Sequence, residues 1–230
     1  MNKQKVFIAC DTNSPKKLNQ IINKSKTNKL NISYKIGLEF FLSPKGRSFI
    51  SKLKNKEIFL DLKLNDIPNT CASALYSLKD LKNVSYLTVH IGGGLEMLKA
   101  VKKCSKKINK KLKILGVTVL TSFSNLSLKE IGYTKTVKEL VKKQAALAKL
   151  AKLDGIVCSG HEAKFLKKIC KNMEIITPGI RLSGDNKEDQ IRIMTPKDAF
   201  QNGATSIVIG RSITKGNIKN NIKKLINSLN

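Results

Sequence analysis

The chain has 230 residues, a length at which a barrel or another α/β fold can form one domain around a single core. Its 44 lysines and arginines against 16 aspartates and glutamates give a formal net charge of +28, which raises the question of nucleic-acid binding. Nothing near the first residues resembles a signal peptide, and no apolar stretch approaches the ~18 residues of a membrane helix. The five cysteines are scattered and include no C-x-x-C pair, which argues against a disulfide framework or a zinc site. We therefore expect a cytoplasmic protein without a membrane segment.

Short apolar segments recur along the chain, and each is followed by a segment whose apolar residues have helical spacing. The predicted strands cover residues 5–11, 32–37, 57–63, 85–90, 112–122, 154–160, 174–180 and 205–211. The predicted helices cover residues 14–27, 43–55, 67–81, 93–107, 136–152, 161–172, 195–203 and 215–230. Ser14-Pro15 and Ser43-Pro44 have the pattern of an N-cap followed by a first-turn proline, and Pro68 and Pro196 also suit helix starts.

This alternation predicts an α/β fold with a parallel sheet. Eight strand–helix units in 230 residues predict a closed (β/α)8 TIM barrel that forms a single domain over residues 1–230. An open, doubly wound sheet is the alternative, but no G-x-G-x-x-G motif follows the first strand.

The lysines are spread over the predicted helices and do not gather in one arm or tail. In residues 98–113 and 138–152, apolar residues keep helical spacing and lysines fill the outer faces. Tryptophan is absent, and the few aromatic residues do not alternate with the basic runs as a base-stacking surface would require. The pattern favours a solvated basic surface over a nucleic-acid partner.

The segment FLDLKLNDIPNT, residues 59–70, carries charges inside an otherwise apolar strand. Because strand residues alternate sides, Asp61 and Lys63 share one face, while Leu60, Leu62 and Leu64 share the other. Charges on the face of a buried strand are costly unless they are paired, so their presence indicates a functional requirement.

Polar residues close most of the predicted strands. They are Asp11, Lys35, Asp61, Lys63, His90, Thr121, Ser122, Ser159 and Arg211. A helix cap or a solvated strand end explains any single one of them equally well. In barrels, however, the carboxyl ends of the strands build the active site, and two aspartates and two lysines at the ends of three consecutive strands favour such a site.

The segment DLKLNDIPNT (61–70) resembles the D-x-K-x-x-D-I-P-x-T signature of the orotidine 5′-phosphate decarboxylase family. The resemblance extends, in the family's order, to YKIGLEFF (34–41), VHIGGG (89–94), VTVLTS (117–122), TPGIR (177–181), EDQIR (188–192) and IVIGRSI (207–213). The last three blocks are similar to the bacterial branch. Cys10 and Ile91 stand where leucine and alanine are usual, which leaves the signature residues untouched.

The resemblance implies conversion of orotidine 5′-monophosphate to uridine 5′-monophosphate and CO2, in de novo pyrimidine biosynthesis, without a cofactor or metal. It makes Lys63 the proton donor to C6 and places Asp61 against the substrate carboxylate. Lys35 and Asp66 complete the charge array. In the family Asp66 and Thr70 reach the neighbouring subunit's site, which implies a homodimer with shared active sites; an N-cap of the helix near Pro68 is the alternative role for Asp66.

The remaining blocks are expected to bind the nucleotide. The resemblance assigns the phosphate to Gly210, Arg211, Arg181 and Gln190, the last two flanking a loop that closes over it. Asp11 suits the ribose hydroxyls, and Thr121 with Ser122 suits the polar edge of the pyrimidine. Pro178 and Ile67 complete the predicted substrate contacts. A hydrogen-bonded core histidine is as good an explanation of His90 as a substrate contact.

Two rival functions belong to other classes. A sugar-phosphate barrel enzyme with the same D-x-K-x-x-D core would need Mg²⁺ held by acidic residues, and Lys35 stands where such an enzyme would want an acid nearby. A basic nucleic-acid-binding protein would show salt-dependent retention on an unrelated duplex.

Overall fold

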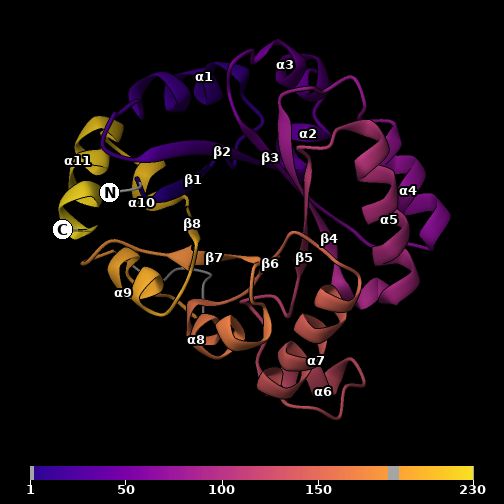
Figure 1. Cartoon of the computed structure of the whole chain (residues 1–230). Helices are drawn as coiled ribbons and strands as arrows, with labels where there is room; N and C mark the ends of the chain where they lie inside the picture. The colour runs from indigo at the N-terminus through magenta and orange to yellow at the C-terminus, as the bar shows by residue number, and fades with distance from the viewer. Residues whose placement is uncertain (1–2, 186–191, 230) are drawn as a thin grey trace.

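Within residues 3–185 and 192–229, which the computed structural model describes, eight parallel strands close into a barrel in which each strand pairs with its sequence neighbours and β8 pairs with β1 (Figure 1). The strands are β1 (Lys5–Ala9), β2 (Asn31–Gly37), β3 (Ile58–Leu64), β4 (Val84–His90), β5 (Lys113–Val117), β6 (Gly155–Val157), β7 (Glu174–Ile180) and β8 (Ser206–Ile209). The predicted (β/α)8 barrel is therefore confirmed, and the alternative of an open sheet is excluded.

The helices surround the barrel, and each predicted helical segment contains one (Figure 1). These are α1 (Pro15–Lys24), α3 (Gly46–Lys52), α4 (Pro68–Tyr76), α5 (Gly94–Ile108), α7 (Val137–Leu150), α8 (Gly160–Ile169), α9 (Pro196–Gln201) and α11 (Ile218–Leu229). Short helices that were not predicted also follow strands at their carboxyl ends. They are α2 (Leu38–Phe41), the 3-10 helix η1 (Ile91–Gly93), α6 (Asn125–Glu130) and α10 (Arg211–Thr214).

The helix-start signals were mostly right. Pro15, Pro68 and Pro196 each occupy the first turn of a helix, and the Ser14 side chain caps α1 by accepting from the Lys17 N–H. Ser43-Pro44 was wrong, because α3 begins only at Gly46. The Ser43 hydroxyl instead donates to the carbonyl of Phe40, at the end of α2, over 2.7 Å.

Strand β5 is shorter than the predicted 112–122. It ends at Val117, because its neighbour β6 has only three residues and offers no backbone partner beyond Val157. The Thr118 N–H still donates to the Val157 carbonyl, and the chain then leaves the sheet. Residues 118–122 therefore form a loop above the barrel rather than the end of a strand.

Inward-facing side chains fill the middle of the barrel. Phe7, Phe59 and Tyr86 meet there, with ring centroids 5.1 Å apart for the two pairs that include Phe7. Leu115, Ile176 and Val208 complete this interior cluster, while a larger apolar cluster lies between the barrel and its helices. The packed interior separates the two ends of the barrel, so a ligand site must lie at one end.

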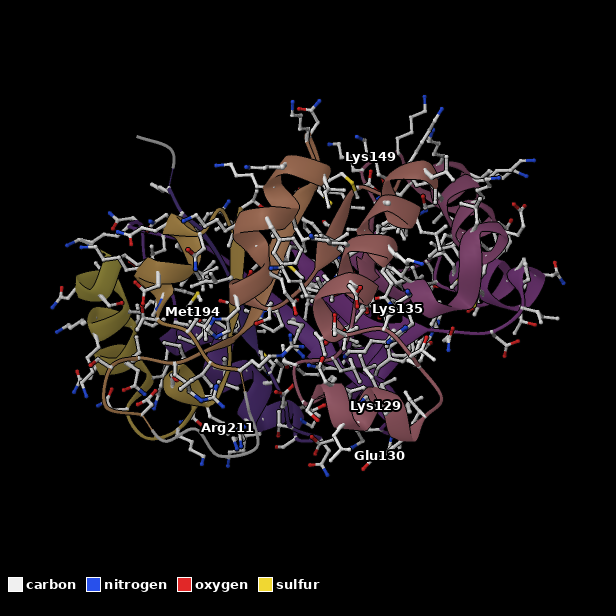
Figure 2. All side chains as sticks on the ribbon, turned by 90° about the horizontal axis from the view of Figure 1, so that it is seen from below. Lys129, Glu130, Lys135, Lys149, Met194 and Arg211 are labelled. Atoms are coloured by element: carbon white, nitrogen blue, oxygen red, sulfur yellow. The ribbon has the colours of Figure 1, made fainter. Side chains whose placement is uncertain are left out.

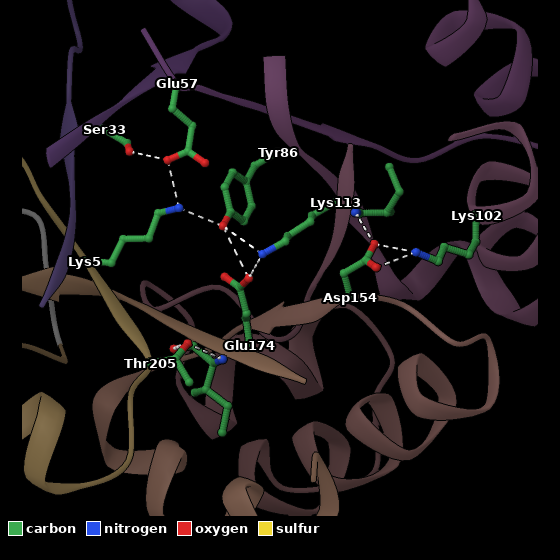
Figure 3. Close-up of polar contacts among 11 residues, drawn as sticks. Lys5, Ser33, Glu57, Tyr86, Lys102, Lys113, Asp154, Glu174 and Thr205 are labelled. Carbon is green, nitrogen blue, oxygen red and sulfur yellow. Dashed lines mark hydrogen bonds and ion pairs between the residues drawn. The ribbon is translucent and has the colours of Figure 1, made fainter. Parts of the chain in front are cut away.

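A polar network closes the amino-terminal end of the barrel around the Tyr86 hydroxyl (Figure 3). Lys5 Nζ donates to that hydroxyl and pairs with Glu57, each over 2.8 Å. Lys113 also donates to it and pairs with Glu174, which in turn accepts from the hydroxyl. Burial and the neighbouring carboxylates raise the pKa of Tyr86, so it stays a neutral donor. Each charged side chain of this network is paired with one of opposite charge, as expected of a structural role.

Basic side chains project from the edge of the molecule on several sides (Figure 2), in agreement with the spread of lysines over the helices. The same view separates the two ends of the barrel. Arg211 lies near the edge formed by Lys129 and Glu130 of α6, and Lys149 of α7 lies at the opposite edge. No helix within the described ranges is long and apolar enough to cross a membrane.

Candidate active site

A pocket of about 750 Å³ opens at the carboxyl ends of the strands. Ten of the predicted site residues line it. They are Asp11, Lys35, Asp61, Lys63, Thr121, Ser122, Pro178, Arg181, Gly210 and Arg211. The packed ring of Phe59 and the side chains of Val157 and Val208 also contribute to its lining. These residues, which were predicted from different parts of the sequence, therefore lie around one pocket.

An alternating row of charges lies along one side of the pocket. Lys35 Nζ is 3.3 Å from Asp11 Oδ1 and 3.3 Å from Asp61 Oδ2. Lys63 Nζ is 3.0 Å from the other oxygen of Asp61, Oδ1. Lys35 therefore lies between the carboxylates of Asp11 and Asp61, and Asp61 lies between the ammonium groups of Lys35 and Lys63. We call Asp11, Lys35, Asp61 and Lys63 the charge array.

The two central members of the charge array are held in their ionised forms. Burial works against charge at both sites, but the Asp61 and Asp11 carboxylates outweigh it and raise the pKa of Lys35. Burial likewise opposes ionisation of Asp61, yet the ammonium groups of Lys35 and Lys63 lower its pKa below the usual range. The side chain of Asp61 is only 13% exposed, so these interactions act with little screening by water.

Strand β3 is irregular where it carries Lys63. Lys63 has a φ of 49°, in the left-handed region that residues with a side chain rarely occupy. The pairing of β3 with β4 shifts register between Leu60 and Leu64, which is a bulge. Within this bulge the Lys63 ammonium lies beside Asp61, and a regular alternating strand pattern does not predict the irregularity.

An arginine with an unused donor lies at the pocket wall. Arg181 is 7% exposed, and its Nη1 donates to the carbonyl of Ile180 over 3.1 Å. Its Nη2 is buried and has no hydrogen-bond partner among residues 3–185 and 192–229. A buried donor without an acceptor costs free energy, and an anionic ligand in the pocket could supply the acceptor for Nη2. Gly210 and Arg211, at the end of β8, line the same pocket.

The loop that carries Thr121 and Ser122 is attached to the barrel by a residue that we did not predict as functional. Arg192 Nη2 donates to the carbonyl of Leu120 over 2.9 Å, and its Nη1 pairs with Glu162. Glu162, almost fully buried at the start of α8, also accepts from the Ser159 N–H over 3.0 Å. The Glu162–Arg192 pair thus connects three segments that are far apart in the sequence.

Replacing Arg192 with methionine should reduce the free energy of unfolding by about 3 kcal/mol, because it leaves the Glu162 carboxylate buried without its cation. Burial raises the pKa of Glu162 and Arg192 opposes that rise, so the variant raises it further. The folded variant then binds a proton more tightly than the unfolded chain, and its stability deficit shrinks as pH falls.

Urea unfolding of the wild type and variant at about pH 8 and about pH 5 measures both effects. The double variant Glu162→Gln/Arg192→Met is the control, since it has no buried charge and should show a smaller, pH-independent deficit. A deficit in the single variant that is the same at both pH values would contradict the assignment of the pair.

Three predicted site residues lie outside the pocket of their own chain. Asp66, Ile67 and Thr70 are exposed and are not among the described residues that line the pocket. Asp66 is not the N-cap of α4 either, because Ile67 holds that position and its N–H donates to Asp66 Oδ1 over 2.7 Å. Gln190, predicted to bind phosphate, falls outside the residues that the structure describes.

His90 and two lysines complete the account of the site. His90 Nδ1 accepts from the Gly92 N–H over 3.3 Å, and burial together with the nearby Lys63 lowers the pKa of the imidazole. His90 does not line the pocket as the described residues define it, which agrees with a hydrogen-bonded structural histidine. Lys17 and Lys215 do line it but were not predicted, because surface lysines are too numerous in this chain for any one to be distinctive.

The carboxylates of the pocket are paired with a lysine. Within the described part of the chain, no group of three or more histidine, cysteine, aspartate or glutamate side chains is placed to hold a metal ion. The two carboxylates of the pocket, Asp11 and Asp61, are each engaged with Lys35.

The chain is similar in sequence to known proteins. An orotidine 5′-phosphate decarboxylase of Wolbachia sp. subsp. Brugia malayi (strain TRS) is 44% identical over 225 residues, or 96% of each chain. One of Legionella pneumophila (strain Corby) is 40% identical over 215 residues, or 92% of each chain.

Solved structures give the same result. The orotidine 5′-phosphate decarboxylase of Lactobacillus acidophilus superposes with a TM-score of 0.85 at 32% identity, over 99% of this chain and 100% of that one. The orotidine 5′-monophosphate decarboxylase of Methanocaldococcus jannaschii, in complex with the inhibitor BMP, superposes with a TM-score of 0.77 at 26% identity, over the full length of both chains. The sequence model of one family matches residues 4–224, and the chain therefore belongs to the orotidine 5′-phosphate decarboxylase / HUMPS family.

Proposed function

We propose that the protein decarboxylates orotidine 5′-monophosphate to uridine 5′-monophosphate, using only its own side chains. The observation that carries the proposal is the charge array, which places two ammonium groups and two carboxylates beside a pocket whose wall offers an unused arginine donor. The names of the relatives support the same reaction.

The reaction needs a fixed cation at C6 of the pyrimidine ring. Breaking the bond between C6 and the carboxylate leaves the electron pair on C6, in the ring plane, where the π system cannot delocalise it. We assign Lys63 to stabilise this pair and to donate the proton that forms the C6–H bond. Because Lys63 is part of the charge array, its ammonium is already oriented by Asp61 before the substrate arrives.

Asp61 is assigned to face the substrate carboxylate. Two carboxylates in a poorly hydrated site repel each other, and this repulsion disappears as the substrate carboxylate becomes neutral CO2. The positions of Lys35 and Lys63 on either side of Asp61 keep it ionised, so the repulsion is present throughout the working pH range.

The remaining residues of the pocket are assigned to other parts of the nucleotide. The phosphate fits the Nη2 donor of Arg181, with Arg211 and Gly210 beside it. Asp11, at the exposed end of the charge array, is assigned to the ribose, and Thr121, Ser122 and Pro178 to the pyrimidine. Gln190 is proposed to close over the phosphate on the resemblance alone.

We further propose a homodimer in which Asp66, Ile67 and Thr70 complete the partner's pocket. Two large apolar side chains that follow β2 and β3 are exposed: Leu42 is 72% exposed and Ile67 is 67% exposed. A groove of about 270 Å³ against β3 and α4 is lined by Phe41, Arg47, Leu62, Leu64, Ala74, Ser77 and Leu78. Exposed apolar side chains at such a groove are typical of subunit interfaces.

The experiment that tests the proposal follows the absorbance of orotidine 5′-phosphate during incubation with the purified protein. A steady loss, with uridine 5′-monophosphate as the product, is expected. Parallel reactions with EDTA distinguish the sugar-phosphate alternative, since a reaction that depends on Mg²⁺ would stop. No loss of the substrate at any enzyme concentration would exclude the proposed function.

Replacing Arg211 with alanine should reduce kcat/KM for orotidine 5′-phosphate by roughly tenfold to a hundredfold, the effect of one charge-assisted hydrogen bond. Activity toward orotidine, which lacks the phosphate, should change little. Lys99→Ala is the control, because it removes a positive charge from an exposed position on α5, where Lys99 pairs with Glu96. Equal losses toward both substrates would show that Arg211 does not bind the phosphate.

A further inference from the structure

A buried threonine lies at the bulge in β3. Leu60 pairs with Leu87, and Leu64 pairs with Val89, so the three residues 61–63 of β3 face the single residue Thr88 of β4. Such a bulge removes regular backbone partners from the longer strand. The Thr88 side chain is fully buried in the gap that this mismatch leaves.

The hydroxyl of Thr88 contacts two members of the charge array. Its Oγ1 accepts from the backbone N–H of Lys63 over 2.9 Å and donates to Asp61 Oδ1 over 2.9 Å. The same oxygen of Asp61 accepts from Lys63 Nζ over 3.0 Å. The backbone of Lys63, the hydroxyl of Thr88, the carboxylate of Asp61 and the ammonium of Lys63 therefore form a closed ring of contacts.

We propose that Thr88 is a positioning residue that fixes Lys63 and Asp61 relative to each other, an inference that rests on the proposed decarboxylase function. A hydroxyl has one proton to donate, and here it goes to Asp61, so its lone pair must receive the Lys63 N–H. Both contacts are thereby specified, and neither can be exchanged for water because Thr88 is inaccessible.

The left-handed backbone of Lys63 explains why such a support is needed. A lysine at a φ of 49° has a strained backbone, and this conformation persists only when its surroundings hold it. Thr88 supplies the bond that the bulge removes from the strand ladder. Without the hydroxyl, the Lys63 N–H and one lone pair of Asp61 Oδ1 lose their partner together, and the backbone can relax.

Two substitutions separate the hydroxyl from the shape of the side chain. Thr88→Val keeps the shape and removes the hydroxyl, while Thr88→Ser keeps the hydroxyl and removes the methyl group. Thr205→Val is the matched control. The Thr205 hydroxyl accepts from the Ile175 N–H over 3.0 Å and donates to the Ile175 carbonyl over 3.1 Å, and Thr205 is not among the described residues that line the pocket.

The measurements are kcat and KM for orotidine 5′-phosphate, and the Kd of uridine 5′-monophosphate, which has the phosphate and ribose but no carboxylate. Thr88→Val should lose roughly tenfold to a hundredfold in kcat and keep the Kd of the product within about threefold. Thr88→Ser should keep kcat within about threefold of the wild type, and Thr205→Val should not change it. A purely structural role would weaken product binding together with kcat.

A second measurement needs no variant. The Lys63 amide of the wild type should exchange its hydrogen slowly, at the rate of the neighbouring strand amides, because Thr88 Oγ1 accepts from it in a dry site. Rapid exchange of this amide would overturn the proposal even if Thr88→Val failed to fold.

Three kinetic outcomes would also overturn it: an unchanged kcat in Thr88→Val, a loss in Thr88→Ser equal to that in Thr88→Val, or a loss confined to product binding. These outcomes are distinct from failure of the proposed function. If the wild type does not decarboxylate orotidine 5′-phosphate, the function fails, whereas if the wild type is active and Thr88→Val is equally active, only the role of Thr88 fails.

Discussion

Replacing Lys63 with alanine should reduce the turnover of orotidine 5′-phosphate by roughly 10⁴-fold to 10⁷-fold. Loss of a general acid removes about 10² to 10⁴ in rate, and loss of a fixed charge at the developing carbanion removes a further 10² to 10³. The barrel should still fold, because the Lys63 side chain is 36% exposed and Asp61 keeps its contact with Lys35.

Single-turnover kinetics with excess Lys63→Ala protein can measure so large a loss, and circular dichroism checks the fold. Lys99→Ala is a suitable control, since it removes the same charge from an exposed position on α5, where Lys99 pairs with Glu96. A well-folded Lys63→Ala protein with a tenth of the wild-type activity would refute Lys63 as the proton donor.

Mixing two inactive variants should restore activity if the sites are shared between subunits. Lys63→Ala and Asp66→Asn are each expected to be almost inactive alone. In a heterodimer, one site receives both defects, and the other combines the intact Lys63 of one chain with the intact Asp66 of its partner. Random exchange of equal amounts makes half of the dimers mixed, so about a quarter of all sites should be active.

Lys63→Ala mixed with Asp61→Asn provides the matched control. Asp61 and Lys63 contact each other within one chain, so every site of that heterodimer has one defect and no activity should return. Mass spectrometry establishes that the subunits have exchanged. If they have, and the Lys63→Ala and Asp66→Asn mixture stays inactive, Asp66 serves its own chain's site or none.

The sequence was sufficient to predict the barrel, because the strand and helix patterns of its segments agree with the order of elements in the folded chain. Alternating strand and helix patterns, and prolines such as Pro15 and Pro196, marked the elements correctly. The errors occurred where a tertiary contact decides the outcome. The Ser43 hydroxyl contacts the preceding helix rather than capping the next one, and β5 ends early because β6 is short.

The sequence was enough to predict ten of the residues that line the pocket, but not how they contact one another. Strand-end position and the resemblance pointed to Asp11, Lys35, Asp61 and Lys63, which the fold brings together. Thr88 gave no signal, since a threonine in a strand is ordinary and only the register of β3 against β4 gives it two partners in the charge array. The Glu162–Arg192 pair was missed for the same reason, because its partners are 30 residues apart in the sequence.

The pairing of β8 with β1 joins the two ends of the chain, and it does so directly beneath the pocket. A Cβ atom added to Gly210, which follows β8, would lie 3.5 Å from the Ala9 Cβ and 3.9 Å from Asp11 Oδ2. A nucleotide that contacts Asp11 through its ribose and Arg211 through its phosphate would therefore bridge the first strand and the last. Among the strands that the structure describes, β8 and β1 are the only neighbours in the barrel that no connecting segment joins. The binding free energy of the nucleotide would oppose their separation, so the substrate would stabilise the closed barrel at this pair of strands.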